Sequence, residues 1–416
     1  MSGKLQPRAQ TASSIVVINN LPNGSNVNMY VSGNDPEGHL VFLGPDREWY
    51  YPSVNNSLSV PTEIPASAIT ISIQGTGQAV DVVLPTDISA GRIWLADGVL
   101  EFSVVSTASS NASLVQPSIP IDSVPTGVDV SWGFVEFTYA QGKGLWVNLS
   151  YVDFVGLALG MILTSSSPET SSVASQWALG LQSNATSTIC RELANQSMLD
   201  GYPWGALCIE DSYSRPFRIL SPNMYIQMHA EAFADYWTSY IDQVWTRYTT
   251  QGLTINTQSV DFGNVSCSVQ SDSLICTSAS ASGGGNAIYT KPSAKDIFSC
   301  NSGPFAAPSD LYQAVTPRLC SAINRSTLLL TGGNVQPDGV ASSLYYDGEV
   351  TNWYSKLVHQ WEIEGKGYAF PYDDISPSME HQSQAGELTS YEPWVLTLLV
   401  GGALECKIAK SITSFH

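Results

Sequence analysis

The stretch WGFVEFTYAQGKGLWVNLSYVDFVGLALGMIL, residues 132–163, decides how the rest of the chain is interpreted. It holds two carboxylates, Glu136 and Asp153, among residues that are mostly aromatic, β-branched or small. Only 13% of the chain is charged, and an unpaired carboxylate in apolar surroundings is costly or has its pKa shifted upward. Two such acids in one apolar segment indicate either a structural polar network or an acid/base pair.

The segments WGFVEFTYA and LWVNLSYV predict two strands joined by a Gly-rich turn. A two- or four-residue loop would pair Glu136 with Leu149 and mix polar with apolar side chains. A three-residue loop at 142–144 pairs Glu136 with Ser150 instead, and Gly144 suits the left-handed position that such loops need. This register separates a polar face from an apolar one: Glu136, Thr138, Trp146, Asn148 and Ser150 against Val135, Phe137, Tyr139, Val147 and Leu149.

The polar face of this hairpin is typical of a sugar-binding surface. Trp146 offers a flat apolar ring to a pyranose, and Thr138, Asn148 and Ser150 offer hydrogen-bonding groups. The alternative is a solvated outer face that carries a single Trp. The Asn-Leu-Ser triplet at Asn148 argues against a binding role, because a glycan there would obstruct the face.

Asp153 does not fit the same regular strand, because residues 150 and 153 have opposite parity. Either it faces the core, or the chain bulges or turns between Ser150 and Asp153. A bend would let Asp153 face Glu136, and an inverting glycosidase needs two carboxyl groups roughly 6.5–9.5 Å apart, with water beside one of them. A regular strand through residues 150–153 would contradict this interpretation.

Charge narrows the class of ligand. The net charge is −19 with only 17 Lys and Arg, which argues against nucleic acid and against an anionic membrane surface. A neutral polysaccharide is compatible with this balance. The longest apolar runs, 152–163 and 394–404, are too short to span a bilayer, so we expect a soluble protein.

Composition favours an extracellular protein. Ser, Thr, Asn and Gly are abundant, as in β-rich secreted proteins. The first residues lack the apolar core of a signal peptide, so a secreted chain would begin after a cleaved leader. Asn-x-Ser/Thr triplets, which favour glycosylation, occur at Asn23, Asn55, Asn111, Asn148, Asn184, Asn195, Asn264 and Asn324.

The cysteine pattern predicts disulfides and no metal. None of the seven cysteines lies in a C-x-x-C pair, and the five His are scattered, so we expect no zinc site. Connectivity is not fixed by sequence, but bridges would indicate an oxidising compartment. Near neighbours in sequence suggest Cys190–Cys208, Cys267–Cys276 and Cys300–Cys320, with Cys406 left over.

The patterns predict a mainly β protein with an α/β part. Short runs of β-favouring residues, bounded by turn residues, fill 14–165 and indicate a sandwich or barrel, completed by strands from 253–290. Helical spacing and a final strand at 394–399 indicate a mixed α/β lobe from 166–252 and 291–404. We expect helices within 169–198 (with Thr170 or Ser171 as cap), 221–250, 296–325 and 351–362, a disordered 1–13, a flexible turn at 280–287 and a tail at 405–416.

In these segments the chain resembles glycoside hydrolase family 64, the β-1,3-glucanases with a thaumatin-like fold. The similarity runs in family order over roughly residues 15–404. The segments that carry it are FVEFTY (134–139), VNLSYVDFVGLALG (147–160), DGYPWGAL (200–207), RILSPNMYI (218–226), YIDQVWTRY (240–248) and GYAFPYDD (367–374).

The resemblance implies a thaumatin-like β-barrel lobe and a mixed α/β lobe flanking a wide acidic groove that takes a glucan chain. The catalytic Glu of the family matches Glu136 and its catalytic Asp matches Asp153, as general acid and general base of an inverting reaction that needs no metal or cofactor. Glucan contacts carry over to Thr138 and Trp146, and Ser150 stands where the family has Thr. The spacing between the two acids is about one residue longer here, and residues from 405 onward have no counterpart.

Two neighbouring acids, Asp373 and Asp374, either line the same groove as substrate contacts or form a solvated turn or cap. The main alternative to an endo-acting β-1,3-glucanase is a non-catalytic thaumatin-like β-glucan-binding protein. A serine hydrolase is disfavoured, because G-x-S-x-G is absent and His229 and His359 lie in helical patterns. We expect a secreted monomer that binds β-1,3-glucan and neither nucleic acid nor membrane.

Overall fold

The computed structural model describes residues 14–403 apart from 55–59, 108–110, 120–129, 167–172, 280–284 and 379–382. The chain forms two compact units, each assembled from segments that are separated in sequence. Unit 1 draws its described residues from Met1–Leu149, Gly156–Ser183 and Glu387–His416, and unit 2 from Ser150–Val155 and Asn184–Gly386. The mainly β character with an α/β part is confirmed, whereas the division between the units differs from the predicted one.

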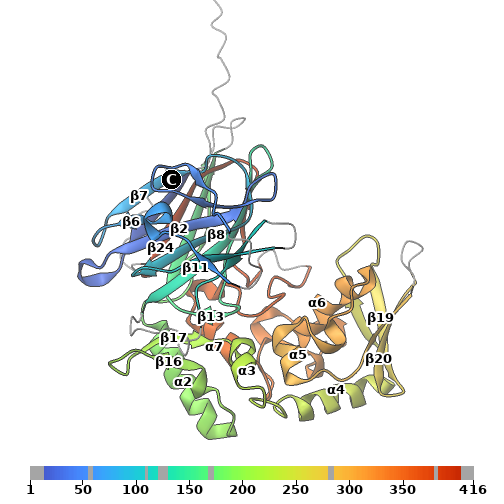
Figure 1. Cartoon of the computed structure of the whole chain (residues 1–416). Coiled ribbons are helices and arrows are strands. Elements are labelled where there is room, and N and C mark those ends of the chain that lie inside the picture. The colour runs from blue at the N-terminus through green and yellow to red at the C-terminus, as the bar shows by residue number, and fades with distance from the viewer. Residues whose placement is uncertain are drawn as a thin grey trace, which may run out of the picture. The chain divides into compact units, whose positions relative to one another are not determined.

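Unit 1 contains an eight-stranded sheet that carries the 132–149 hairpin (Figure 1). Along β11 aromatic and β-branched residues alternate with polar ones from Val135 onward, as in a strand with one solvated face. The sheet order is β23 (Leu388–Ser390), β12 (Gly144–Leu149), β11 (Ser131–Ala140), β8 (Ile88–Asp97), β2 (Val27–Asn34), β3 (Leu40–Leu43) and β4 (Trp49–Tyr50), with β6 (Ile71–Ile73) also paired to β2.

A five-stranded sheet forms the second layer of unit 1. Gly133 of β11 packs against it, since a Cβ there would lie 3.2 Å from Leu159 Cδ1. Its order is β15 (Val173–Ala178), β14 (Leu159–Ser166), β24 (Pro393–Val400), β1 (Ser14–Asn19) and β7 (Ala79–Val83). A short helix, α1 (Ala66–Ile69), and a small sheet of β10 (Ala112–Val115), β9 (Ser103–Ser106) and β5 (Thr62–Glu63) complete the unit.

The sheets of unit 1 are open within the described residues. Each strand order has two ends that do not pair with each other. Of the two predicted forms, sandwich or barrel, the barrel is therefore wrong, and the sheets are layered. The strand that completes the second layer is β24, from the C-terminal part of the chain, rather than a strand from 253–290.

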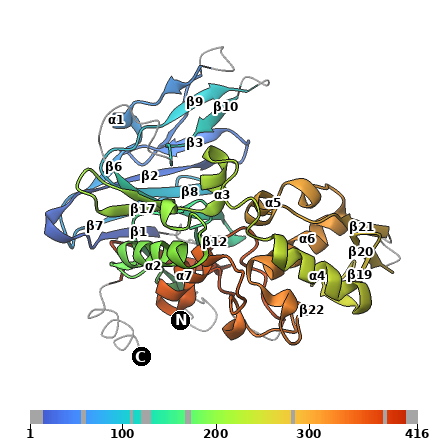
Figure 2. The same cartoon turned by 90° about the horizontal axis from the view of Figure 1, so that it is seen from below.

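Unit 2 has its own sheets. The strands from 253–290 pair with one another and with β22, and α4 and α6 lie beside them (Figure 2). The order is β21 (Gly285–Tyr289), β20 (Ser273–Ser278), β19 (Asn264–Gln270), β18 (Leu253–Asn256) and β22 (Val335–Gln336). A smaller sheet contains β13 (Phe154–Val155), β17 (Pro216–Leu220) and β16 (Cys208–Glu210).

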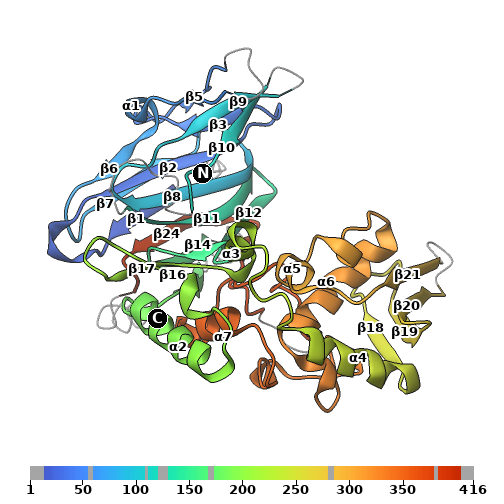
Figure 3. The ribbon, with the colours of Figure 1, turned by 60° about the horizontal axis from the view of Figure 1, so that its bottom comes forward.

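The helices of unit 2 differ in part from the prediction. The described part of the region 169–198 first forms β15 and becomes helical only in α2, while the helix expected over 221–250 is divided into α3 and α4. Phe233 lies between them at φ 61° and is buried, and a right-handed helix cannot run through a left-handed residue. The helices are α2 (Ala185–Asp200), α3 (Pro222–Met228), α4 (Thr238–Thr250), α5 (Ala294–Ser299), α6 (Asp310–Asn324) and α7 (Trp353–Trp361), with α2 beside α7 (Figure 3).

All three predicted disulfides are present: Cys190–Cys208, Cys267–Cys276 and Cys300–Cys320. Asn324, by contrast, is fully buried, so its triplet cannot carry a glycan in the folded protein. The predictions for residues 1–13, the Thr170/Ser171 cap, most of the 280–287 turn, Cys406 and the 405–416 tail lie outside the described residues.

Candidate active site

The β11–β12 hairpin carries the first part of the predicted site, in unit 1. The loop has three residues, as predicted, but it is 141–143 rather than 142–144, so Glu136 pairs with Asn148 and not with Ser150. The reason lies at Gly144, where a Cβ would fall 2.4 Å from the carbonyl oxygen of Ser390. Gly144 is therefore needed for close strand packing, while Gly142, at φ 74°, serves the loop.

This shift leaves the two faces of the hairpin as predicted. Moving the pairing by two residues keeps every side chain on its side of the sheet, whereas a shift of one would exchange the faces. The even-numbered Glu136, Thr138, Trp146 and Asn148 are partly exposed, and their odd-numbered neighbours are buried. Ser150 is the exception, because it is only 8% exposed and has left the strand.

Glu136 is held by an arginine that the sequence reasoning missed. Arg92 lies directly opposite Glu136 in the antiparallel β8–β11 pair, and its Nε and Nη2 both donate to Oε1, at 3.2 and 2.9 Å. The guanidinium rests over the rings of Phe134 and Trp94, at 4.7 and 5.4 Å from their centres. The signal in the sequence was a lone charge in the apolar run AGRIWLA.

The second oxygen of Glu136 remains available. Among the described residues no hydrogen-bond partner reaches Oε2, and the side chain is 36% exposed. A carboxyl group held through one oxygen can present the other to a ligand in a defined direction. The arrangement therefore suits a proton exchange at Oε2.

A second aromatic ring accompanies Trp146. Tyr391, in the turn between β23 and β24, meets it edge to face with ring centres 6.1 Å apart. β23 runs alongside β12, with Thr389 opposite Trp146, and Tyr391 is 77% exposed. Trp146 and Tyr391 together form an aromatic corner on the polar face, which sequence reasoning could not assemble because the two rings lie far apart along the chain.

Asp153 belongs to unit 2. β12 ends at Leu149, Ser150 forms an isolated parallel bridge with Tyr368, and Asp153 lies in a bend before β13. The predicted irregularity between residues 150 and 153 is confirmed. Asp153 is partly buried, and its carbonyl oxygen accepts from the Ser221 N–H at 2.9 Å. This bond ties the bend to the start of α3.

A buried cation lies next to the Asp153 bend. The guanidinium carbon of Arg218, on β17, is 5.3 Å from the ring centre of Phe154, the residue that follows Asp153. Burial lowers the pKa of Arg218 to about 10. A positively charged guanidinium therefore packs against the residue next to Asp153.

The neighbours Asp373 and Asp374 point in different directions. Asp373 is fully buried and bonded within unit 2, which corrects its predicted contact with substrate. Asp374 is exposed and remains a candidate contact.

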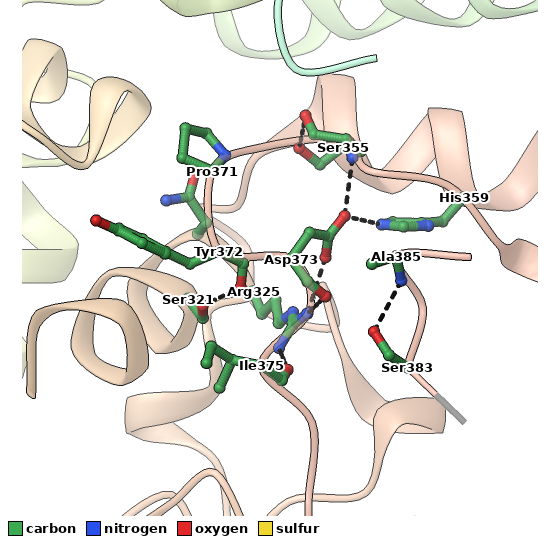
Figure 4. Close-up of polar contacts among 12 residues, drawn as sticks. Ser321, Arg325, Ser355, His359, Pro371, Tyr372, Asp373, Ile375, Ser383 and Ala385 are labelled. Atoms are coloured by element: carbon green, nitrogen blue, oxygen red, sulfur yellow. Dashed lines mark hydrogen bonds and ion pairs between the residues drawn. The ribbon is translucent and has the colours of Figure 1, made fainter. Parts of the chain in front are cut away.

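Asp373 belongs to a buried charged network (Figure 4). Its Oδ1 accepts from Arg325 Nη2 at 2.8 Å, and its Oδ2 lies 2.9 Å from both His359 Nε2 and the Ala369 N–H nitrogen. His359 Nδ1 lies 2.9 Å from Glu362 Oε2. Burial lowers the pKa of His359, but the Asp373 and Glu362 carboxylates outweigh it and raise the pKa to about 10. The imidazole is therefore charged at neutral pH.

Asp373 is ionised for the complementary reason. Burial would raise the pKa of its carboxyl group, yet His359 and Arg325 hold that pKa below its ordinary value. Arg325, His359, Asp373 and Glu362 are called the buried quartet below. His359 is thus a satisfied structural histidine, as expected for one in a helical pattern.

The described residues contain neither a cluster of metal ligands nor a membrane-spanning helix. No group of three or more His, Cys, Asp or Glu side chains among them is arranged to hold a metal ion. In the same part of the chain no helix has the length and apolar character that crossing a membrane requires.

Known proteins are similar to this chain over most of its length. A family model described as β-1,3-glucanase, of glycoside hydrolase family 64, matches residues 11–400. Two proteins named glucan endo-1,3-beta-glucosidase, from Cellulosimicrobium cellulans and from Arthrobacter sp. (strain YCWD3), are each 28% identical over 299 residues, 72% of this chain and 50% of theirs. The chain thus spans half the length of these relatives.

Solved structures support the fold. A laminaripentaose-producing β-1,3-glucanase, crystallised with laminaritetraose, matches with a TM-score of 0.78 and 23% identity, over 94% of this chain and 98% of its own. A β-1,3-glucanase domain from Clostridium beijerinckii matches with a TM-score of 0.70 and 18% identity, over 95% and 100%.

Proposed function

Because the chain belongs to the glycoside hydrolase 64 family of β-1,3-glucanases, we propose that it is an endo-acting enzyme that cleaves β-1,3-glucan into short oligosaccharides. Relatives named glucan endo-1,3-beta-glucosidase and a related structure that holds laminaritetraose support this substrate. The observation that carries the proposal is Glu136, held through Oε1 by Arg92 on a face that also presents Trp146.

In the proposed reaction Glu136 is the general acid and Asp153 the general base. Glu136 donates a proton, from Oε2, to the glycosidic oxygen as the bond from that oxygen to the anomeric carbon breaks. Asp153 takes a proton from a water molecule, whose oxygen attacks the anomeric carbon from the opposite side of the sugar ring. The water therefore replaces the leaving sugar with inversion of configuration.

The glucan contacts follow from the polar face. Trp146 and Tyr391 supply apolar rings to the sugar, and Thr138 supplies a hydroxyl group beside Glu136. Asp374, an exposed acid of unit 2, is proposed as a further contact. Ser150 stays in the proposal as a minor contact, because little of it is exposed.

The remaining expectations belong to the same proposal. The disulfides fit a secreted protein, and a thaumatin-like arrangement and a monomeric state are expected from the family resemblance. The second candidate function is a non-catalytic β-glucan-binding protein, which would use the same Trp146 face without bond cleavage.

Hydrolysis of laminarin decides between the two functions. We expect reducing ends from the wild type, a loss of about 10²-fold or more in Glu136→Gln and in Asp153→Asn, and unchanged activity in Glu101→Gln, which alters an exposed acid of unit 1. Proton NMR of the first product should show the α-anomer. Glucan binding without release of reducing ends would establish the binding protein instead, and a β-anomer would contradict inversion.

A further inference from the structure

The segment GYAFPYDD, residues 367–374, connects the Asp153 bend to the buried quartet, all within unit 2. At one end, the carbonyl oxygen of Tyr368 accepts from the Tyr151 N–H at 2.7 Å, next to the Ser150–Tyr368 bridge. At the other end, Asp373 is bonded to Arg325 and His359. One segment therefore joins the chain just before Asp153 to the ion pairs.

Helix α7 makes a second connection between the same two places. The hydroxyl of Tyr354 donates to the Tyr151 carbonyl oxygen at 2.5 Å, and Ser355 Oγ donates to the Ala369 carbonyl oxygen at 3.2 Å. His359 follows Ser355 by one helical turn. The main-chain N–H and C=O of Tyr151 are thus both engaged, one by the 367–374 segment and the other by α7.

Glu362 is the member of the quartet that packs closest to the Tyr151–Asp153 bend. A Cβ at Gly367 would lie 2.2 Å from Glu362 Oε1 and 2.7 Å from the Tyr151 ring, so these three residues pack in close contact. Burial raises the pKa of Tyr354 well above its ordinary value, and the charges of Asp153 and Glu362 add to this effect. Tyr354 therefore lies within the electrostatic reach of both the proposed base and the quartet.

Stability alone does not explain four buried ionisable groups at this position. Burying ions carries a desolvation penalty, and well-packed apolar residues of similar volume often stabilise a core as well or better. Ion pairs and hydrogen bonds differ from apolar contacts in fixing directions. A general base needs such direction, because displacement by about 1 Å can cost about 100-fold in rate.

We propose that the buried quartet is a positioning device, which fixes the Tyr151–Asp153 bend through Tyr368 and Tyr354 and thereby sets where the Asp153 carboxylate meets the attacking water. The inference rests on the proposed function of Asp153. None of the quartet touches substrate in this account. Each of its members acts through the bend.

Tyr354→Phe tests the device with minimal disturbance, because it removes one hydroxyl. Tyr248→Phe is its matched control: that hydroxyl is also buried in unit 2 and donates to carbonyl oxygens, of Leu328 and Gly333, away from the bend. We expect Tyr354→Phe to lower kcat on laminarin about 10- to 100-fold with KM within about 2-fold of the wild type. The acid limb of its kcat/KM profile should also move, since that limb reports the base.

The control should lose a similar amount of thermal stability and keep kcat and the pH profile. His359→Asn, which breaks the quartet itself, should repeat the kcat loss in the fraction that remains folded. Equal kcat in Tyr354→Phe and Tyr248→Phe, or a change in KM alone, would overturn the positioning role while leaving the glucanase proposal intact. An inactive wild type would overturn both.

Discussion

Arg92 and Glu136 face each other across neighbouring antiparallel strands, with 2.9 Å between Nη2 and Oε1. Directly opposite positions bring side chains of one face within contact distance, so the strand register itself forms this ion pair. The pair occupies Oε1 of Glu136, so Oε2 is left for the proposed proton transfer and its direction is fixed. Arg92, placed by the strand register, therefore orients the carboxyl group of the proposed acid.

Replacing Arg92 by Gln should lower kcat about 10- to 100-fold with little change in KM, because the carboxyl group of Glu136 loses its two donors and their direction. The free energy of unfolding should change by about 1 kcal/mol or less, since the pair is partly exposed. Steady-state kinetics on laminarin and urea denaturation measure both quantities. Arg215→Gln, which removes an exposed arginine from its pair with Asp211, is the control. A change confined to KM would contradict this role of Arg92.

Trp146→Ala and Tyr391→Ala should each raise KM about 5- to 30-fold, the equivalent of about 1–2 kcal/mol of ring contact with sugar. Since neither ring takes part in proton transfer, kcat should fall less than kcat/KM. Tyr213→Ala removes a similarly exposed ring from unit 2 and should leave KM unchanged. A Tyr391 variant with wild-type KM would limit the binding surface to Trp146.

Asp373→Asn and Asp374→Asn form a matched pair of neighbouring substitutions. The first leaves Arg325 and His359 without their shared carboxylate and should cost about 3–5 kcal/mol of the free energy of unfolding. The second changes an exposed acid and should leave that free energy within about 0.5 kcal/mol of the wild type. Any effect of this substitution should be confined to glucan binding. Chemical denaturation of both variants measures the difference. Equal losses of stability in the two variants would contradict the assignment of Asp373 as a buried ion-pair partner and Asp374 as an exposed acid.

The charge on His359 makes stability depend on pH in a defined direction. Its pKa is raised in the folded protein to about 10, against about 6.5 in an unfolded chain. The folded state therefore binds the extra proton between these values, so the stabilisation is complete below about pH 6.5 and is lost as the pH rises towards 10. Urea midpoints at pH 6, 8 and 10 should fall more steeply for the wild type than for His359→Asn. Parallel curves would show that His359 carries no such charge.

The sequence predicted the site best where side-chain parity was the evidence. The period of two in β11 and β12 placed Glu136, Thr138 and Trp146 on one face even though the loop position was one residue in error. The same parity required the irregularity before Asp153, which is present. Parity is a local property, and it survives a register error of two residues such as this one.

What the sequence did not predict depends on contacts between distant segments. Arg92 and Tyr391 join the site only through strand pairing and a turn contact. Adjacent acids in GYAFPYDD give no indication that Asp373 turns inward, because its partners Arg325 and His359 come from two separate helical segments.

The parallel pairing of β1 with β24, which sets Ser14 opposite Val395, bears on biosynthesis. During translation β1 emerges before β24, and residues 20–392 are synthesised between the two strands. Until then β1 can pair with β7 on one side only, and its other edge is open to strands of other molecules. The second layer of unit 1 can therefore be completed only after Pro393–Val400 has been synthesised, and until then the open edge of β1 is a site at which nascent chains can aggregate.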